Sequence, residues 1–407
     1  MSKSTTCPPL LPIAEAQKRL FALAAHVATE TVPLNKAAGR WSATDVFARR
    51  TQPAAALSAM DGYAFRFDDM PGPWRVVGES AAGRPFAGTV HAGEAVRIFT
   101  GAALPSGADT VLVQEEARRE LAPSDNTEGR LYLDGDGPAH RGRNTRPKGL
   151  DFTKGDRLIA AGERLTPARI ALAATAGHGS LAVNRPIRVA TLATGDELVP
   201  PGAAATGVEL PESNTPMVAA LLADLPIELI ELGIVSDSLD DLVHIFSSLS
   251  ADLLVTTGGA SVGDHDLVRP ALNAAGGTID FWRTALRPGK PIMAGRLGNT
   301  MVLGLPGNPV SAFVTTLLFV KPLIAAMAGA RDPLPHTYAA PLGEPIPVNG
   351  ERTDYLRADL IAGRAWASTI QDSSMLLTLA RAGCLIVRPP FAPAAAAGDV
   401  VEILPLA

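Results

Sequence analysis

The sequence predicts a multidomain α/β protein in which a β-rich unit precedes a parallel sheet covered by helices on both faces. Three observations support this prediction. Residues 74–157 hold short alternating runs separated by glycine turns, which is the pattern of a small all-β unit. Residues 187–275 alternate between strand-like and helix-like segments. After the prolines that follow Asp332, short strands and glycine turns return, so a second small β unit is expected.

The first half of the chain is expected to begin with an amphipathic helix, because apolar residues recur there at helical spacing. A loop at residues 58–65 then enters the β-rich unit, and a short helix ended by Gly177 closes it. The expected elements are a helix at 13–30, strands at 75–78, 95–99 and 110–113, and a helix at 168–176.

The second half is expected to form the α/β domain and the second β unit. Its most apolar segment, residues 310–328, is interrupted by Lys321 and Pro322, which counts against a membrane span. The expected strands are 187–192, 227–235 and 252–256, with others near Ile292 and Val302; the expected helices are 214–224, 240–249, 267–275 and 309–328; the last strands are 366–370, 383–388 and 400–404.

Composition narrows the function classes. The net charge of -5 argues against a general nucleic-acid binder, and the 5% of aromatic residues offer little for stacking on bases. Two cysteines, Cys7 and Cys384, form neither a disulfide framework nor a metal cluster. Residues 1–14 lack the apolar core of a signal peptide. We therefore expect a cytoplasmic protein that binds neither nucleic acid nor a membrane.

The segment 253–266 carries the clearest candidate site. A buried strand enters a turn in which Gly258, Gly259 and Gly263 let backbone amides approach a phosphate closely. Ser261 adds a hydroxyl donor, and Asp264 and Asp266 lie two residues apart, so they could hold a hard cation that bridges the phosphate. The alternative is a tight strand-to-helix turn in which an aspartate only caps the helix.

Two further strand ends carry polar residues, namely the segments 194–197 and 236–238. Ligands of open α/β sheets bind beyond the carboxyl ends of the strands, so these segments and the glycine turn should share one rim. A carboxylate there can take a metal, a hydroxyl or an amine, although Asp196 could serve only as a cap. The candidates are Thr194, Gly195, Glu197 and Asp237.

Two basic residues and one helix start are candidate oxyanion ligands. Arg287 and Lys290 flank a stiff Pro-Gly bend and can point the same way, although an ordinary surface turn has the same pattern. Asn308 and Ser311 surround a helix start at Pro309, where free amides can bind an anion; an ordinary capped helix is the alternative. Asp61 and Thr100 are polar loop residues of the first half that carry little weight alone.

Several common catalytic patterns are absent from the sequence. No Walker A lysine follows the central glycines, and no Gly-x-Gly-x-x-Gly follows the first strand of the α/β region. The seven histidines show no metal-ligand spacing, and no Ser-His-acid set can be assembled. An ordinary nucleotide hydrolase or dehydrogenase is therefore disfavoured.

Six segments, spread in order over nearly the whole chain, match motifs of one family. They read SAMDGYA (58–64), TGA (100–102), TGDEL (194–198), GGASVGD (258–264), PGKP (288–291) and GLPGNPVS (304–311). On these motifs the chain resembles the molybdopterin molybdenumtransferases, enzymes of molybdenum cofactor synthesis related to the C-terminal part of gephyrin.

The resemblance implies a fold and an assembly. It implies an elongated homodimer whose site combines the α/β and barrel domains of one subunit with the β-rich insertion of the other, which would give Asp61 and Thr100 a role. The implied domains are an N-terminal linker domain (1–50 and 145–182), a β-rich insertion domain (51–144), a three-layer α/β molybdopterin-binding domain (183–330) and a C-terminal β-barrel domain (331–407).

The resemblance also implies a reaction, in which molybdenum from molybdate enters adenylylated molybdopterin, AMP is released and molybdenum cofactor forms, with Mg²⁺ required. Asp61, Thr100, Glu197, Asp237, Asp266, Arg287 and Lys290 would be catalytic; Thr194, Gly195, Gly258, Gly259, Ser261, Gly263, Asn308 and Pro309 would bind molybdopterin or nucleotide; Arg287, Lys290, Ser311, Arg357 and Ser373 would receive molybdate; Asp264 and Asp266 would hold the metal.

Three positions depart from the family pattern. Arg287 stands where the family often has Lys, Leu150 stands where a Glu is common, and Asp372 and Ser374 flank Ser373 where glycines are usual. Two other functions stay open, namely a related molybdopterin adenylyltransferase and a non-catalytic molybdopterin-binding protein. Other enzymes of cofactor synthesis are further possible partners.

Overall fold

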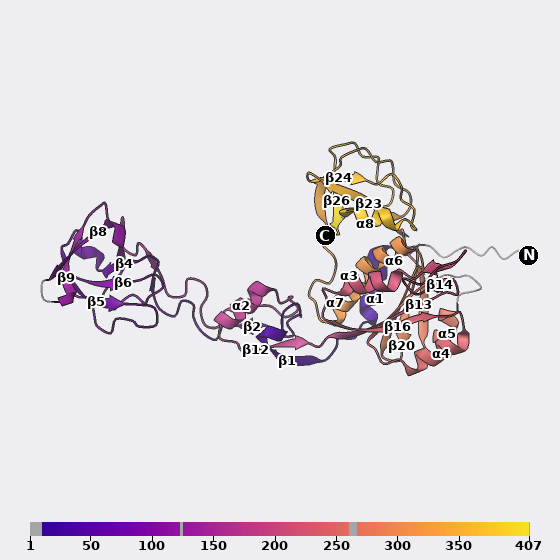
Figure 1. Cartoon of the computed structure of the whole chain (residues 1–407), viewed down its shortest axis with the longest axis horizontal. Helices are drawn as coiled ribbons and strands as arrows, with labels where there is room; N and C mark the ends of the chain where they lie inside the picture. The colour runs from indigo at the N-terminus through magenta and orange to yellow at the C-terminus, as the bar shows by residue number, and fades with distance from the viewer. Residues whose placement is uncertain (1–9, 123–124, 260–266, 407) are drawn as a thin grey trace, which may run out of the picture. The chain divides into compact units, whose positions relative to one another are not determined.

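The computed structural model describes residues 10–122, 125–259 and 267–406 (Figure 1). The chain forms two compact units. The larger unit contains Met1–Thr44, Ala161–Thr166 and Leu181–Ala407, and the smaller unit contains Asp45–Ala160 and Pro167–Ser180. The chain therefore leaves the larger unit and returns to it, as expected for an insertion. The bounds of the four implied domains stay a prediction.

The smaller unit contains a six-stranded sheet with the order β7-β4-β6-β5-β9-β8. Its core is aromatic: the rings of Phe65 and Trp74 lie 4.8 Å apart, and Leu112 and Leu131 are buried beside them. The three expected strands of this unit are confirmed. The strands are β4 (Gly62–Phe65), β5 (Trp74–Ser80), β6 (Glu94–Ile98), β7 (Thr110–Val113), β8 (Ala117–Ala122) and β9 (Asp125–Leu133); short pieces are β2 (Val46–Phe47), β3 (Leu57–Ser58), β10 (Thr145–Arg146), β11 (Arg157–Ile159) and α2 (Pro167–Thr175).

The larger unit contains a six-stranded sheet with the order β16-β13-β17-β21-β20-β18. The first four strands are parallel, as expected, whereas β20 runs antiparallel to both of its neighbours, β21 and β18, so the sheet is mixed at this edge. The cause is the turn at Gly298 and Asn299, because two residues can join only antiparallel neighbours. The strands are β13 (Ile187–Thr194), β16 (Ile227–Val235), β17 (Leu253–Thr257), β18 (Thr278–Arg283), β20 (Pro291–Leu297) and β21 (Thr300–Leu305).

Helices cover both faces of this sheet, as the alternation predicts. Successive residues of a strand point to opposite faces, so Val255 belongs to the core cluster that includes residues of α1, α3, α6 and α7, while Leu254 belongs to the cluster that includes residues of α4 and α5. The three-layer arrangement is therefore confirmed. The helices are α1 (Ile13–Leu23), α3 (Asn214–Leu222), α4 (Leu239–Ser248), α5 (Val268–Ala274), α6 (Pro309–Thr315) and α7 (Lys321–Met327).

Helix α1 ends at Leu23, seven residues before the expected end. The chain instead extends into β1 (Thr29–Pro33), which pairs with β12 (Ser180–Asn184). The N–H of Val27 binds the carbonyl of Met327 at 3.0 Å, which ties this extended segment to the end of α7. Tertiary pairing therefore overrides the helical periodicity of residues 24–30.

Among the described residues, one helix, Pro309–Met327, is long and apolar enough to cross a membrane, but 78% of its apolar window is buried inside the structure. A π-helical turn, η4 (Thr316–Val320), joins its two α-helical parts. Such a turn leaves backbone groups without regular partners, and the buried Gln17 side chain of α1 donates to the Leu318 carbonyl at 2.8 Å. The segment is therefore a core helix of the larger unit.

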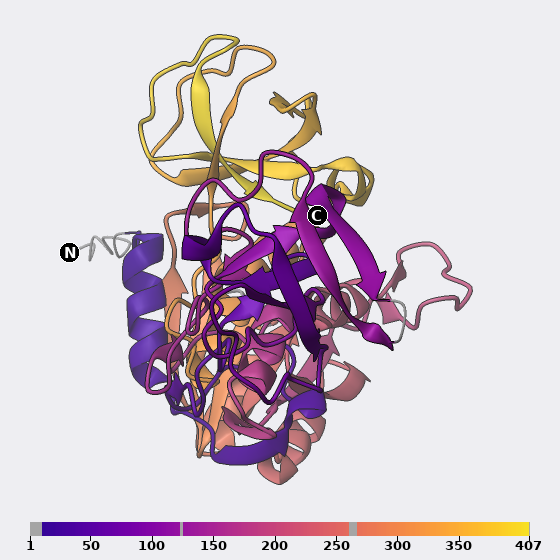
Figure 2. The same ribbon diagram turned by 90° about the vertical axis from the view of Figure 1, so that its left-hand side faces the viewer.

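The C-terminal strands form a second sheet of the larger unit, with the order β19-β23-β25-β26-β22, drawn in yellow and orange in Figure 2. β24 pairs with β23, and a bridge between Leu342 and Ala365 links the β22 side to β24. This bridge supports a barrel, which stays a prediction. The elements are β19 (Leu286–Arg287), β22 (Tyr338–Pro341), β23 (Thr353–Ile361), β24 (Arg364–Ala367), α8 (Leu376–Arg381), β25 (Cys384–Arg388) and β26 (Val400–Pro405).

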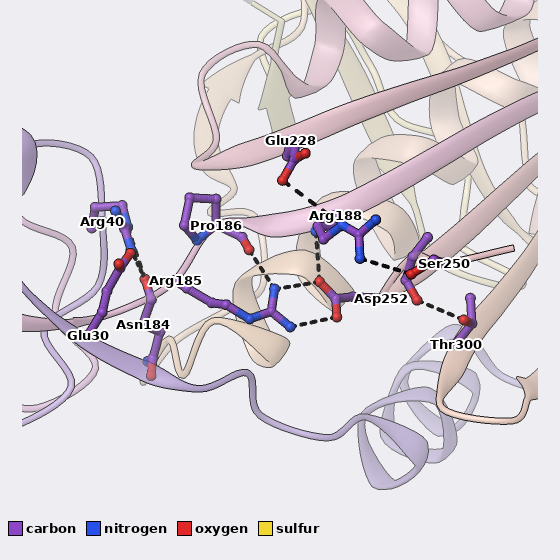
Figure 3. A network of polar contacts seen from close by, with 11 residues as sticks. Glu30, Arg40, Asn184, Arg185, Pro186, Arg188, Glu228, Ser250, Asp252 and Thr300 are labelled. Atoms are coloured by element: carbon purple, nitrogen blue, oxygen red, sulfur yellow. Dashed lines mark hydrogen bonds and ion pairs between the residues drawn. The ribbon is translucent and has the colours of Figure 1, made fainter.

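A polar network connects the extended segments around β1 and β12 to the α/β sheet (Figure 3). Arg185 binds both oxygens of Asp252 at 2.7 Å, and the N–H of Arg188 binds the same carboxylate at 2.8 Å. The Arg40 side chain donates to the Asn184 carbonyl at 2.9 Å and pairs with Glu30 at 2.5 Å. These contacts hold the segment 184–188, in which β13 begins, to Arg40 and to Asp252.

Candidate functional site

A cavity of about 1300 Å³ lies at the carboxyl ends of three parallel strands. Glu197 follows β13, Gly258 and Gly259 follow β17, and Asn308 follows β21; all four line the cavity. The expected rim joined the ends of β13, β16 and β17; residues after β13 and β17 line the cavity, whereas Asp237, which follows β16, does not. Ser261, Gly263, Asp264 and Asp266 lie outside the described residues.

Two glycines allow the cavity wall to follow the sheet closely. Gly258 has φ +86°, and a Cβ there would stand 2.7 Å from the Thr194 carbonyl oxygen. Gly259 has φ +65°. A side chain at position 258 would therefore collide with β13 as well as strain the backbone. In contrast, the hydroxyls of Thr256 and Thr257 are buried, and neither residue lines the cavity.

The other polar residues of the β13 and β16 ends bind one another. The Thr194 hydroxyl donates to Asp237 at 2.8 Å, and the N–H of Asp237 donates to the Asp196 carboxylate at 3.0 Å. Thr194, Gly195 and Asp237 do not line the cavity themselves. The hydrogen bonds of Thr194 and Asp237 join the ends of β13 and β16 next to it. Glu197 is the carboxylate of this segment that reaches the wall.

Three cations line the cavity: Arg287, Lys290 and Arg352. Lys290 makes no ion pair with any of the described residues, whereas Arg287 pairs with Asp354 at 3.2 Å. Burial raises the pKa of the Asp354 carboxyl, against the opposing effect of Arg287. The sequence reasoning missed Arg352, because it lies in a charged loop before β23 whose position only the fold determines.

The start of α6 lies on the cavity wall, but one of its backbone N–H groups already has a hydrogen-bond partner within the protein. Pro309 is its first residue, and Asn308 and Ser311 line the cavity. The N–H of Val310 donates to the Ser373 carbonyl at 3.1 Å, so one of the free amides expected to bind an anion already has a partner. Ser373 also lines the cavity. The contact ties the C-terminal β unit to the α/β domain.

Arg357 does not line the cavity, contrary to its expected place beside Ser373. Its side chain is 1% exposed, and it donates to Gln371 at 3.3 Å, to the Met375 carbonyl at 3.1 Å and to the Ile370 carbonyl at 3.2 Å. Burial lowers the pKa of this guanidinium. Arg357 therefore holds the loop that carries Ser373, and a direct contact with molybdate stays a prediction.

Asp61 and Thr100 are in direct contact. One oxygen of the Asp61 carboxylate accepts hydrogen bonds from the backbone N–H and from the hydroxyl of Thr100, both at 2.7 Å. The backbone hydrogen bond from Thr100, followed by the hydroxyl, lowers the pKa of Asp61. Both residues belong to the smaller unit, whereas the cavity belongs to the larger one.

Two cavity residues at the start of α3 were not recognised from the sequence. Glu212 is buried and accepts hydrogen bonds from the N–H groups of Asn214 at 2.7 Å and Thr215 at 2.9 Å, so it caps the helix. The Asn214 amide donates to the Gly307 carbonyl at 2.7 Å and joins two rim segments. An acidic residue just before a helix was the signal that could have identified Glu212.

The described residues contain no group of three or more His, Cys, Asp or Glu side chains that could hold a metal. The carboxylates that line the cavity are Glu197, Glu212 and Asp372. Glu212 caps α3, and Asp372 accepts from the N–H and the hydroxyl of Ser374, whose hydrogen bonds lower its pKa. Glu197 is the remaining cavity carboxylate, and a role for it in binding Mg²⁺ stays a prediction.

Three family models match the chain. They describe the MoeA N-terminal region (domain I and II) over residues 11–177, a probable molybdopterin binding domain over residues 190–326, and the MoeA C-terminal region (domain IV) over residues 339–406. Together the matches cover the two β-rich parts and the α/β domain.

Characterised relatives and solved structures extend over most of the chain. The molybdopterin molybdenumtransferase of Haemophilus influenzae is 37% identical over 75% of this chain and 74% of its own length. That of Staphylococcus aureus is 30% identical over 97% of this chain and 95% of its own length. The molybdopterin biosynthesis MoeA protein of Pyrococcus horikoshii is similar in structure, with a TM-score of 0.81 at 26% identity, covering 98% of this chain and 100% of that protein.

Proposed function

The chain belongs to the molybdopterin molybdenumtransferase family, and we propose that the cavity of its larger unit brings adenylylated molybdopterin and molybdate together. As a family member it is a transferase of molybdenum cofactor biosynthesis. The observation that carries the proposal is the cavity itself. It gathers Gly258, Lys290 and Ser311, which come from separate stretches of the chain, onto one wall.

The proposed reaction joins two anions. Water attacks the phosphorus on the molybdopterin side of the anhydride, the P–O bond to AMP breaks, and AMP leaves. The two dithiolene thiols then form two Mo–S bonds, and one oxygen of molybdate leaves as water with the two thiol protons, so the oxidation state of molybdenum does not change. Both steps need negative charges held close together, so positioning and charge neutralisation would provide most of the acceleration.

Each part of the wall suits one reactant. The backbone at Gly258 and Gly259 is open to a phosphate, because neither residue has a side chain. Arg287 and Lys290 supply N–H donors and positive charge for a tetrahedral oxyanion, and the hydroxyl of Ser311 lies on the same wall. Arg352 adds a third cation, which we include in the oxyanion region.

We propose that Mg²⁺ binds next to the phosphate region. When bound, the ion would neutralise charge that develops on the phosphate oxygens. Glu197 is the described residue that would ligate it, together with Asp264 and Asp266, which lie outside the described residues. The three side chains offer oxygen donors, the ligand type that Mg²⁺ prefers.

We further propose that the enzyme works as a homodimer in the cytoplasm. The smaller unit would complete the cavity of a second copy with Asp61 and Thr100. The observation that supports this proposal is that these two residues are hydrogen-bonded to each other and lie outside the unit that carries the cavity. Cys384 is free and buried, which is compatible with a reducing compartment.

The test is a reaction of the purified chain with adenylylated molybdopterin, molybdate and Mg²⁺. We expect AMP and molybdenum cofactor in equal amounts. Consumption of ATP with molybdopterin alone would favour an adenylyltransferase instead. Binding of molybdopterin without any release of AMP would favour a non-catalytic role.

A further inference from the structure

The cavity residue Arg287 is joined to Asp354 by the backbone as well as by its side chain. β19 and β23 pair in parallel, and their register sets Arg287 opposite Asp354. An Nη1 atom of Arg287 lies 3.2 Å from an Oδ2 atom of Asp354. The N–H of Thr353 also donates to the Ala285 carbonyl at 2.9 Å, which fixes this register. The ion pair therefore forms at a defined place rather than between two mobile side chains.

The two partners differ in exposure and in which cavity they line. The Arg287 side chain is 55% exposed, and the Asp354 side chain is 8% exposed. Arg287 lines both the main cavity and a smaller one of about 350 Å³, whereas Asp354 lines only the smaller one. Asp354 therefore contacts the guanidinium from the side of the smaller cavity, where it does not face an anion in the main one.

The buried Asp354 carboxylate needs a cationic partner, and Arg287 is the residue that pairs with it. A buried carboxylate loses hydration, and burial raises the pKa of Asp354 while Arg287 opposes this rise. Removing Arg287 would leave the carboxylate buried without its ion-pair partner, which is unfavourable even though the charge of Arg352 also opposes the rise in its pKa. Conversely, Asp354 engages one N–H of a group that has five, and Arg287 makes no other side-chain hydrogen bond to the residues that the structure describes.

We propose that Asp354 is a positioning residue, which holds Arg287 so that the unused N–H groups of its guanidinium form a fixed fork for a tetrahedral oxyanion in the main cavity. This inference rests on the proposed function of that cavity. The planar guanidinium can serve the carboxylate with one edge and the oxyanion with another.

The experiment measures initial rates against molybdate concentration for the wild-type chain and three variants: Asp354→Asn, Arg287→Ala and the double variant. Asp359→Asn is the matched control, because Asp359 is an exposed residue of the same strand. We expect Asp354→Asn to raise KM for molybdate about tenfold while kcat stays within about twofold, because uniform binding is lost.

The double variant separates positioning from a general structural effect. If Asp354 acts through Arg287, adding Asp354→Asn to Arg287→Ala raises KM no further. Additive effects, or an unchanged KM in Asp354→Asn, would overturn the inference. Thermal unfolding of each variant shows whether any loss comes from unfolding. A wild-type chain that neither releases AMP nor binds molybdate in calorimetry would instead defeat the proposed function itself.

Discussion

Arg185 binds Asp252 through two hydrogen bonds of 2.7 Å each, at the point where the chain enters the α/β sheet (Figure 3). The Asp252 side chain is 18% exposed and also accepts the N–H of Arg188 at 2.8 Å. A carboxylate with three such bonds depends on all of them, because each was made at the expense of hydration.

We predict that Asp252→Asn lowers the free energy of unfolding by about 2 kcal/mol near neutral pH, since hydrogen bonds to a charged group are lost. Burial alone would raise the pKa of Asp252, but the bonds from Arg185 and Arg188 outweigh it and lower the pKa below 3.8. The contribution is therefore present above about pH 4 and is lost as the pH falls further, because the unfolded chain binds the proton first.

Urea unfolding at about pH 7 and about pH 3.5 checks this prediction. The difference between wild type and Asp252→Asn should shrink at the lower pH. Glu228→Gln is the control from the same network: Glu228 is 67% exposed and lies 4.0 Å from Arg188, so it should change stability by less than about 0.5 kcal/mol. Equal effects of the two substitutions would contradict our account of the network.

Gly258 and Gly276 form a matched pair, because both have φ +86°. An added Cβ would meet the Thr194 carbonyl oxygen at 2.7 Å in the first case and nothing within 4 Å in the second. We predict that Gly276→Ala costs about 1 kcal/mol of stability from backbone strain and leaves the rate of AMP release unchanged. Gly258→Ala should cost more and lower kcat/KM at least about tenfold, because the wall must move. Equal stability and activity in the two variants would exclude a special role for the Gly258 backbone.

Asp61 and Lys290 test whether one site is built from two subunits. Alone, Asp61→Ala and Lys290→Ala should each be nearly inactive. If the proposed homodimer forms, co-expression gives mixed dimers with one intact site, so we expect about one quarter of wild-type activity when subunits pair at random. Asp61→Ala co-expressed with Thr100→Ala is the control and should show no rescue, because both lesions lie in the same unit. An inactive Asp61/Lys290 mixture that contains mixed dimers would contradict a shared site.

The sequence predicts part of the cavity rim, and the reason is topological. Carboxyl ends of adjacent parallel strands must meet at one edge, so Glu197 and Gly258 could be grouped before their positions were known, whereas Asp237, grouped with them for the same reason, does not line the cavity. The antiparallel edge was not predicted, because the alternation of strands and helices before it favours parallel pairing. The two-residue turn at Gly298 and Asn299 instead makes β20 and β21 pair antiparallel.

The basic side of the cavity was harder to predict, because it depends on long-range pairing. Arg352 and Asp354 reach the Arg287 region only because β23 pairs with β19, and no local pattern announces that pairing. The resemblance implies that Arg357 contacts molybdate, which stays a prediction. In the structure this side chain is buried and donates hydrogen bonds to backbone carbonyls of the 370–375 loop, an arrangement that no local sequence pattern indicates.

The most direct measurement of the central claim is the rate of AMP release and molybdenum incorporation in Lys290→Ala, with Lys18→Ala as the control on the exposed face of α1. If the cavity binds both anionic reactants, Lys290→Ala loses at least about a hundredfold in rate at limiting molybdate, because a cation for the oxyanion is removed. Lys18→Ala should match the wild type. A Lys290→Ala protein that keeps the wild-type rate would contradict the assignment of this cavity as the active site.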